Sequence, residues 1–161
     1  MAEIRYVRGD ATAPQSEGNV VIAHICNDVG GWGKGFVLAL SARWREPEAA
    51  YRRWYADSED PEAGAFALGA VQFVPVTERI TVANMIGQHG IRSYGGVPPI
   101  RYNAVEQCMQ RVADHCTAAA AEVHMPRIGC GLAGGTWEEI EAILRRTLVA
   151  AGVCVTVYDF A

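Results

Sequence analysis

Residues 19–36 read NVVIAHICNDVGGWGKGF, an apolar run followed by a glycine-rich loop. The run at residues 19–27 is short and nearly continuous, which predicts a central β-strand covered on both faces. The glycines that follow let the backbone take positive φ and approach a ligand closely. A helix that begins after such a loop turns its unpaired N–H groups and the positive end of its dipole toward the ligand.

A second stretch of the same kind lies at residues 126–137, which read PRIGCGLAGGTW. Strands that alternate with helices imply a mostly parallel sheet, whose strands present their carboxyl ends to the ligand. Two glycine loops on neighbouring strands would form a cleft suited to a diphosphate. The alternative is that these glycines only make tight turns.

The remaining sequence fits the same α/β organisation. Six strands are predicted, at residues 3–8, 19–27, 68–75, 79–86, 122–128 and 153–158. Three helices are predicted, at residues 34–45, from Pro99 to Cys116, and from Thr136 to Gly152. Glu139 stands at the reciprocal position of a capping box that starts at Thr136. Residues 57–64 predict an acidic surface turn. We therefore expect one domain over residues 1–161, with three α/β/α layers around a six-stranded mixed, mostly parallel sheet.

The composition limits the class of ligand. The 161 residues are half hydrophobic, enough for one ordinary domain, and carry a formal net charge of −4. That charge argues against nucleic-acid binding through a general attraction for phosphate backbones. An anionic small ligand would have to be held by backbone N–H groups and one or two placed cations. The sequence shows no secretory signal and no run of 18 apolar residues, so we expect a cytoplasmic monomer that does not bind membranes.

The five cysteines are scattered and contain no C-x-x-C pair, so neither a disulfide framework nor a zinc knuckle is indicated. We expect reduced, mostly buried thiols. A metal site of His24, Cys26 and Cys130 is conceivable, but packed thiols are far commoner. No metal or organic cofactor is therefore expected.

Two familiar nucleotide-binding motifs fail on spacing. A P-loop requires glycine where Asp28 stands and a hydroxyl residue where Gly35 follows Lys34. Neither glycine loop contains a G-x-G-x-x-G with the spacing of a dinucleotide-binding fold.

A different set of motifs resembles the macrodomain family. It comprises Gly9-Asp10, His24-x-Cys26-Asn27 running into Gly30-x-Trp32-Gly33-x-Gly35, and M-P-R-I-G-C-G-L at residues 125–132. The resemblance extends from Ile4 to Phe160 and is similar to the branch with terminal ADP-ribose glycohydrolases and a fungal ADP-ribose-1''-phosphate phosphatase. It implies a macrodomain fold and binding of ADP-ribose and of mono-ADP-ribosylated proteins.

The resemblance also implies roles for single residues. Asp10 would accept a hydrogen bond from the adenine amino group beside the Ala11 N–H, although it could instead be a turn aspartate. Tyr158 and Phe160 are candidates for a ring beside adenine, and one of the two could equally belong to the core. The two loops would supply the other ligand contacts, from Gly33, Lys34, Gly35, Phe36, Gly129, Cys130, Gly131, Leu132, Ala133 and Gly134. Lys34 could touch phosphate or point into water.

The resemblance places the Asn27 amide near the distal ribose, where it can donate to and accept from hydroxyls. His24 matches a histidine of the phosphatase, although a satisfied core histidine is the plainer interpretation. The glycohydrolases use a lysine and an aspartate where this chain has Gln88 and Ala133, so a covalent lysine adduct is unavailable.

The catalytic candidates are therefore Asn27, Asp28, Gln88 and His24, with His89, Arg92 and Tyr94 in a mobile flap at residues 87–96. We expect water held between Asn27 or Gln88 and a ligand phosphate that acts as base. Because a carboxylate leaves without protonation, removal of ADP-ribose from Glu or Asp side chains is the favoured activity. An ADP-ribose-1''-phosphate phosphatase that uses His24, and a reader that binds without turnover, are the alternatives.

Overall fold

The computed structural model describes residues 2–60 and 65–160. Its centre is a six-stranded sheet in the order β1-β6-β5-β2-β4-β3, in which only the edge strand β3 runs antiparallel to its neighbour. The strands are β1 (Ile4–Arg8), β2 (Asn19–Asn27), β3 (Val71–Pro75), β4 (Ile80–Gln88), β5 (Ala121–Pro126) and β6 (Val155–Asp159). This confirms the predicted six-stranded, mixed and mostly parallel sheet.

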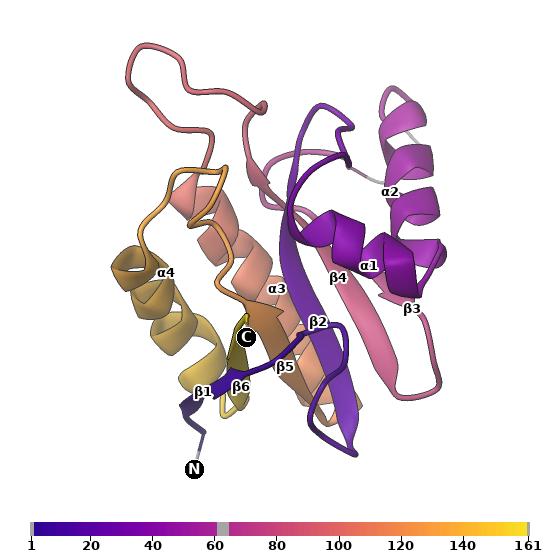
Figure 1. Ribbon diagram of the computed structural model, residues 1–161, viewed down its shortest axis with the longest axis vertical. Helices are drawn as coiled ribbons and strands as arrows, with labels where there is room; N and C mark the ends of the chain where they lie inside the picture. Colours follow the sequence, from indigo (N-terminus) through magenta and orange to yellow (C-terminus); the bar gives the residue numbers. More distant parts are fainter. Residues whose placement is uncertain (1, 61–64, 161) are drawn as a thin grey trace.

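Helices cover both faces of the sheet (Figure 1). They are α1 (Phe36–Arg43), α2 (Glu46–Ala56), α3 (Tyr102–Ala119) and α4 (Trp137–Leu144), and α4 continues into a π-helical turn, η1 (Arg145–Val149). Alternate residues of β2 enter different cores: Val21 and Ala23 join the cluster with α3 and α4, while Val20 and Ile22 join the cluster with α1. The prediction that β2 is buried on both faces is therefore confirmed.

Helix α2 is absent from the predicted elements. Its sequence EPEAAYRRWYA places Glu46, Pro47 and Glu48 in the first turn, as a helix start prefers. Tyr51 is the buried anchor of this helix and lies against Trp32. The helix was missed because only Pro47 and Tyr51 of its eleven residues are fully buried, which leaves a weak apolar period.

Two local predictions change in the structure. Thr136 is the N-cap of α4, but its side chain makes no capping hydrogen bond, so the predicted capping box with Glu139 is wrong. The acidic turn predicted at residues 57–64 is a turn at 57–59, and residues 61–64 lie outside the described part of the chain. In the described part of the chain, no helix is both long and apolar enough to cross a bilayer.

Candidate functional site

The carboxyl ends of the five parallel strands define one edge of the sheet. Strand β2 pairs in parallel with both β4 and β5, so the loops that follow these three strands leave the sheet side by side. A change of register between Cys26 and Asn27 marks the point where β2 gives way to its loop. This edge therefore brings together the two glycine loops and the segment after Gln88.

Both glycine loops border open space. A Cβ atom built on Gly33, Gly35 or Gly131 meets no atom within 4 Å. Gly35 also has φ of 83°, a conformation that favours glycine, and it is the N-cap of α1. A ligand can therefore approach the backbone at these positions without displacing a side chain.

The same loops carry backbone N–H groups that bond to nothing within residues 2–60 and 65–160. Those of Gly33 and Lys34 in the first loop, and of Gly131 and Leu132 in the second, donate no hydrogen bond to a described residue. All four residues are exposed, so these donors lie at the surface. Such clusters of outward N–H groups suit the oxygens of a phosphate.

The base of the second loop is packed tightly. Gly129 has φ of 76°, and a Cβ there would lie 2.6 Å from Cδ1 of Ile100. The backbone N–H of Ile100 donates to the Ala133 carbonyl at 3.0 Å, and that of Gly135 donates to Gly129 at 2.7 Å. The loop is thus fixed from behind, while Gly131 and Leu132 project outward.

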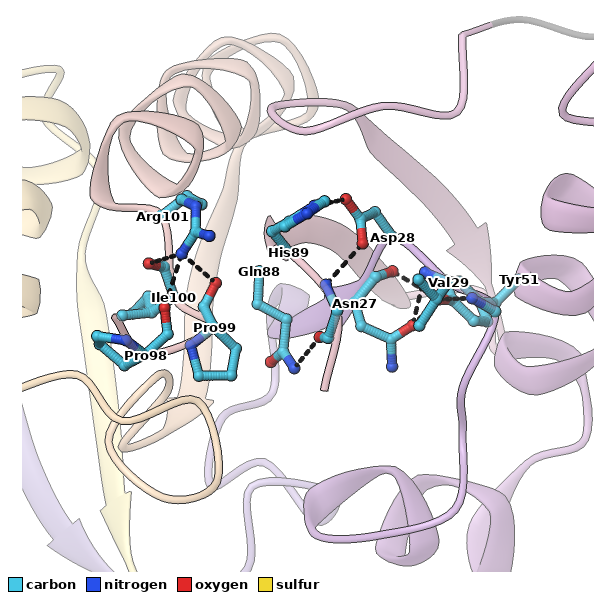
Figure 2. A network of polar contacts seen from close by, with 12 residues as sticks. Asn27, Asp28, Val29, Tyr51, Gln88, His89, Pro98, Pro99, Ile100 and Arg101 are labelled. Carbon is cyan, nitrogen blue, oxygen red and sulfur yellow. Dashed lines mark hydrogen bonds and ion pairs between the residues drawn. The ribbon is translucent and has the colours of Figure 1, made fainter. Parts of the chain in front are cut away.

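The side-chain amide of Asn27 makes hydrogen bonds to the backbone of the first loop. Its Oδ1 accepts the N–H of Val29 and the hydroxyl of Tyr51 (Figure 2). Oδ1 also accepts the N–H of Gly31, and Nδ2 donates to the Gly31 carbonyl at 3.0 Å. The Tyr51 oxygen also accepts the N–H of Gly30. Asn27 is therefore the internal support of this loop, and the residue as a whole is only 9% exposed.

Asp28 and His89 form a contact between the ends of β2 and β4. Oδ2 of Asp28 lies 2.7 Å from Nδ1 of His89, and Oδ1 accepts the Gly90 N–H at 2.8 Å (Figure 2). Gln88, the last residue of β4, donates from Nε2 to the Gly90 carbonyl. Asp28 is 17% exposed in its side chain, whereas His89 is 61% exposed.

His24 lies inside the core of the α1 side rather than on the open edge. Its Nε2 lies 2.5 Å from Oδ1 of Asn84, whose amide nitrogen already donates to Gln72 and Pro47. Nε2 therefore carries the proton, and Nδ1 has no partner among the described residues. Burial lowers the pKa of His24 to about 4, so the ring is neutral at pH 7. The structure favours the core interpretation of this residue.

The predicted adenine region lies at the ends of β1 and β6. Asp10 accepts from both the backbone N–H and the hydroxyl of Thr12 through Oδ1, so it makes a local turn. Ala11 is buried. Tyr158 is also buried, with its hydroxyl bonded to the N–H of Gln15 and to His124, whereas Phe160 is 86% exposed. Tyr158 is thus the core member of the pair.

The remaining predicted site residues divide by exposure. Lys34 and Leu132 are exposed, Phe36 and Cys130 are half-buried, and Gly134 is exposed but backed by Pro98. The predicted flap is exposed from Ile91 to Val97, which includes Arg92, and its tip is closed by mutual backbone hydrogen bonds between Tyr94 and Val97.

His24, Cys26 and Cys130, which were only conceivable metal ligands, do not come together as a group that could hold an ion. His24 and Cys26 are neighbours in the core, and Cys130 lies in the second loop. Within the described residues, no three His, Cys, Asp or Glu side chains gather where they could hold a metal ion. A cavity of about 430 Å³ lies at the opposite edge of the sheet, beside Asn19, Ala121 and Cys154. Its lining includes no residue of the two glycine loops, whereas those loops combine open space with the unpaired N–H groups of Gly33, Lys34, Gly131 and Leu132.

Two buried polar networks were missed in the sequence. Asn84 ties His24 to α2, and His124 joins Glu122 to Tyr158 through its two ring nitrogens. Burial lowers the pKa of His124, which Glu122 partly opposes. Alternation along β5 could have indicated that Glu122 and His124 share a face, but not which partner they meet across the sheet.

The sheet topology and the two open glycine loops define an α/β protein whose carboxyl edge presents unpaired backbone N–H groups. No family model matches the chain. The chain is 55% identical to a macrodomain protein from Streptomyces coelicolor of known structure, with a TM-score of 0.87 over 98% of this chain and 99% of that one. The chain therefore belongs to the macrodomain family.

Two further relatives extend the comparison. A mouse chromodomain-helicase-DNA-binding protein 1-like is 31% identical over 98% of this chain, which spans only 18% of the length of that relative. An ADP-ribose 1''-phosphate phosphatase from Lodderomyces elongisporus is 24% identical over 88% of this chain and 90% of its own length.

Proposed function

We propose that this macrodomain binds ADP-ribose across the two glycine loops and removes it from acidic side chains of proteins. The proposal that the protein binds ADP-ribose rests on one observation. The backbone N–H groups of Gly33, Lys34, Gly131 and Leu132 are unpaired among the described residues, and the glycines of both loops border open space. Their loops follow neighbouring parallel strands, so one diphosphate can engage both. The adenosine lies toward Asp10 and Phe160, and the distal ribose toward Asn27 and Gln88.

The Ala11 N–H and a carboxyl oxygen of Asp10 are the proposed contacts of the base. Asp10 uses Oδ1 for Thr12, and Oδ2 makes no hydrogen bond to a described residue. A carboxylate has room for this further bond because each oxygen accepts more than one donor. Phe160 supplies an exposed ring beside the same strand ends.

Hydrolysis of an ester to Glu or Asp is supported by leaving-group chemistry. The family resemblance implies that Gln88 and Ala133 stand where related hydrolases carry a lysine and an aspartate, so neither a lysine adduct nor an aspartate base is available there. A carboxylate departs without protonation, so orientation of water and ribose supplies much of the rate acceleration. The fungal relative, an ADP-ribose 1''-phosphate phosphatase, supports hydrolysis near the distal ribose.

The position of His24 argues against the phosphatase alternative, in which this residue would be the nucleophile. His24 is 2% exposed and hydrogen-bonded to Asn84, so it has no surface with which to contact a 1''-phosphate. The second candidate function is a reader that binds ADP-ribose without turnover, which the uncharged Gln88 and Ala133 favour.

One experiment separates these functions. The protein is incubated with a Glu-linked mono-ADP-ribosylated protein, with ADP-ribose-1''-phosphate and with free ADP-ribose, in the presence of a chelator. We expect release of ADP-ribose from the first substrate above spontaneous ester hydrolysis, no release of phosphate from the second and binding of the third. Binding without release at excess enzyme would establish the reader, and absence of binding would refute the whole proposal.

A further inference from the structure

We infer that His89 is the general base of this hydrolysis and that Asp28 is its positioning residue. The assignment rests on the proposed function and replaces the ligand phosphate that the sequence suggested as base. The contact that carries it is the 2.7 Å hydrogen bond between Nδ1 of His89 and Oδ2 of Asp28. His89 follows the last residue of β4, and Asp28 follows the last residue of the neighbouring β2.

The contact fixes the tautomer of His89. A carboxylate accepts only, so Nδ1 carries the proton that it donates to Asp28, and the lone pair of a neutral ring is on Nε2. Nε2 makes no hydrogen bond to a described residue, and the His89 side chain is 61% exposed. The neutral form of His89 therefore exposes the lone pair of Nε2 on the open edge, beside Gln88.

Asp28 is itself held in place. Its Oδ1 accepts the Gly90 N–H at 2.8 Å, and its side chain is only 17% exposed. The carboxylate is thus oriented by the backbone of the same segment that carries His89. A base oriented by a fixed carboxylate is a recurrent catalytic arrangement, because the carboxylate sets the ring orientation and stabilises the imidazolium that forms.

Water is the only co-reactant in the proposed hydrolysis. The water oxygen forms a bond to C1'' of the distal ribose while the bond from C1'' to the ester oxygen breaks. The electron pair of that bond leaves with the Glu or Asp carboxylate. One water proton passes to Nε2 of His89, and the imidazolium beside Asp28 then releases it to solvent.

The test begins with His89→Ala on a Glu-linked mono-ADP-ribosylated protein. We expect kcat to fall by roughly 100-fold, the scale of a lost general base, with the affinity for free ADP-ribose changed by less than about 3-fold. Because the position is exposed, added imidazole should restore turnover in proportion to its concentration. His115→Ala is the matched control: this histidine stacks on Phe73 at 4.0 Å between α3 and β3, and its loss should leave turnover unchanged.

The Asp28→Asn variant tests whether Asp28 orients the His89 ring for catalysis or only links the two loops. An asparagine can still accept the Gly90 N–H, but its amide can donate to Nδ1 and so favour the tautomer with the proton on Nε2. We expect kcat to fall roughly 10-fold with KM unchanged, and to fall no further when Asp28→Asn is added to His89→Ala, because Asp28 acts through His89.

The outcomes distinguish this assignment from the function on which it rests. A parent protein that fails to hydrolyse the substrate overturns both. A parent that hydrolyses it, together with an undiminished His89→Ala variant, overturns the assignment alone. Loss of rate without imidazole rescue, or additive losses in the double variant, would make the pair a structural link between two loops and also overturn it.

Discussion

A substitution at Gly131 should affect ligand binding without affecting folding. An added side chain meets no atom within 4 Å there, and the residue is exposed. We predict that Gly131→Glu lowers the affinity for ADP-ribose by at least 100-fold, because it places negative charge beside the N–H groups proposed to hold phosphate. Calorimetric titration measures the loss, and the melting temperature should stay near that of the parent.

Gly18→Glu is the matched control for that substitution. Gly18 is also exposed with no atom within 4 Å of an added Cβ, but it lies at the opposite edge of the sheet, before β2. It should leave binding unchanged. Normal binding by a folded Gly131→Glu variant would mean that the second loop does not hold the ligand.

Because His24 is buried, we predict that the free energy of unfolding depends on pH. Its pKa is lowered to about 4 by burial, while an unfolded chain has an ordinary histidine pKa near 6.5. Between these values the unfolded state binds more protons, so the free energy of unfolding falls as the pH falls from about 6.5 to about 4. The contribution is on the order of 3 kcal/mol.

The comparison that isolates this contribution is His24→Gln, which keeps a donor for Asn84 and removes the titration. Denaturant unfolding at pH 7 and pH 4.5 should show a smaller pH effect in the variant than in the parent. His124, whose pKa is also lowered, adds a loss of the same sign to both proteins and cancels in the difference. Equal pH effects in the two proteins would contradict the buried, neutral ring.

At the level of helices and strands, patterns along the chain predicted most of the fold. The run at residues 19–27 coincides with β2, because a doubly buried strand leaves a continuous apolar signal. Helix α2 gave no comparable signal, since its fit depends on Tyr51 reaching a loop 24 residues earlier in the chain. The positions of the glycine loops were predictable. The bond of Asn27 to Tyr51 and the partners of Asp28 and His24 come from distant elements and leave no trace in local sequence.

The connection from β1 to β2 depends on one hydroxyl of β6. The Tyr158 oxygen accepts the Gln15 N–H at 2.7 Å and lies 2.7 Å from Nδ1 of His124. We predict that Tyr158→Phe lowers the free energy of unfolding by about 1–3 kcal/mol, because the buried His124 ring nitrogen and the Gln15 N–H lose their partner. It should also speed amide exchange in residues 10–16. Tyr94→Phe, at an exposed tyrosine, should do neither, and identical exchange in the parent and the Tyr158→Phe variant would refute the link.

At the scale of the whole molecule, ligand binding should stabilise the entire fold against unfolding. We predict that ADP-ribose binds with micromolar affinity and raises the melting temperature with concentration, because it binds the native state alone. AMP should bind much more weakly, since it lacks the second phosphate and the distal ribose. Thermal scans and calorimetry measure both ligands, and no heat and no shift at millimolar ADP-ribose would contradict the two-loop site.

The pairing of β1 with β6 has a consequence for synthesis on the ribosome. β1 is an edge strand whose single neighbour in the sheet is β6, about 150 residues further along the chain. While the chain is being translated, Ile4–Arg8 has no strand to join until Val155–Asp159 emerges. Asp10 follows directly on β1, so the proposed adenine pocket is completed last. Contacts to the adenine beside Asp10 therefore become available only after translation has passed β6, whereas both glycine loops are made earlier.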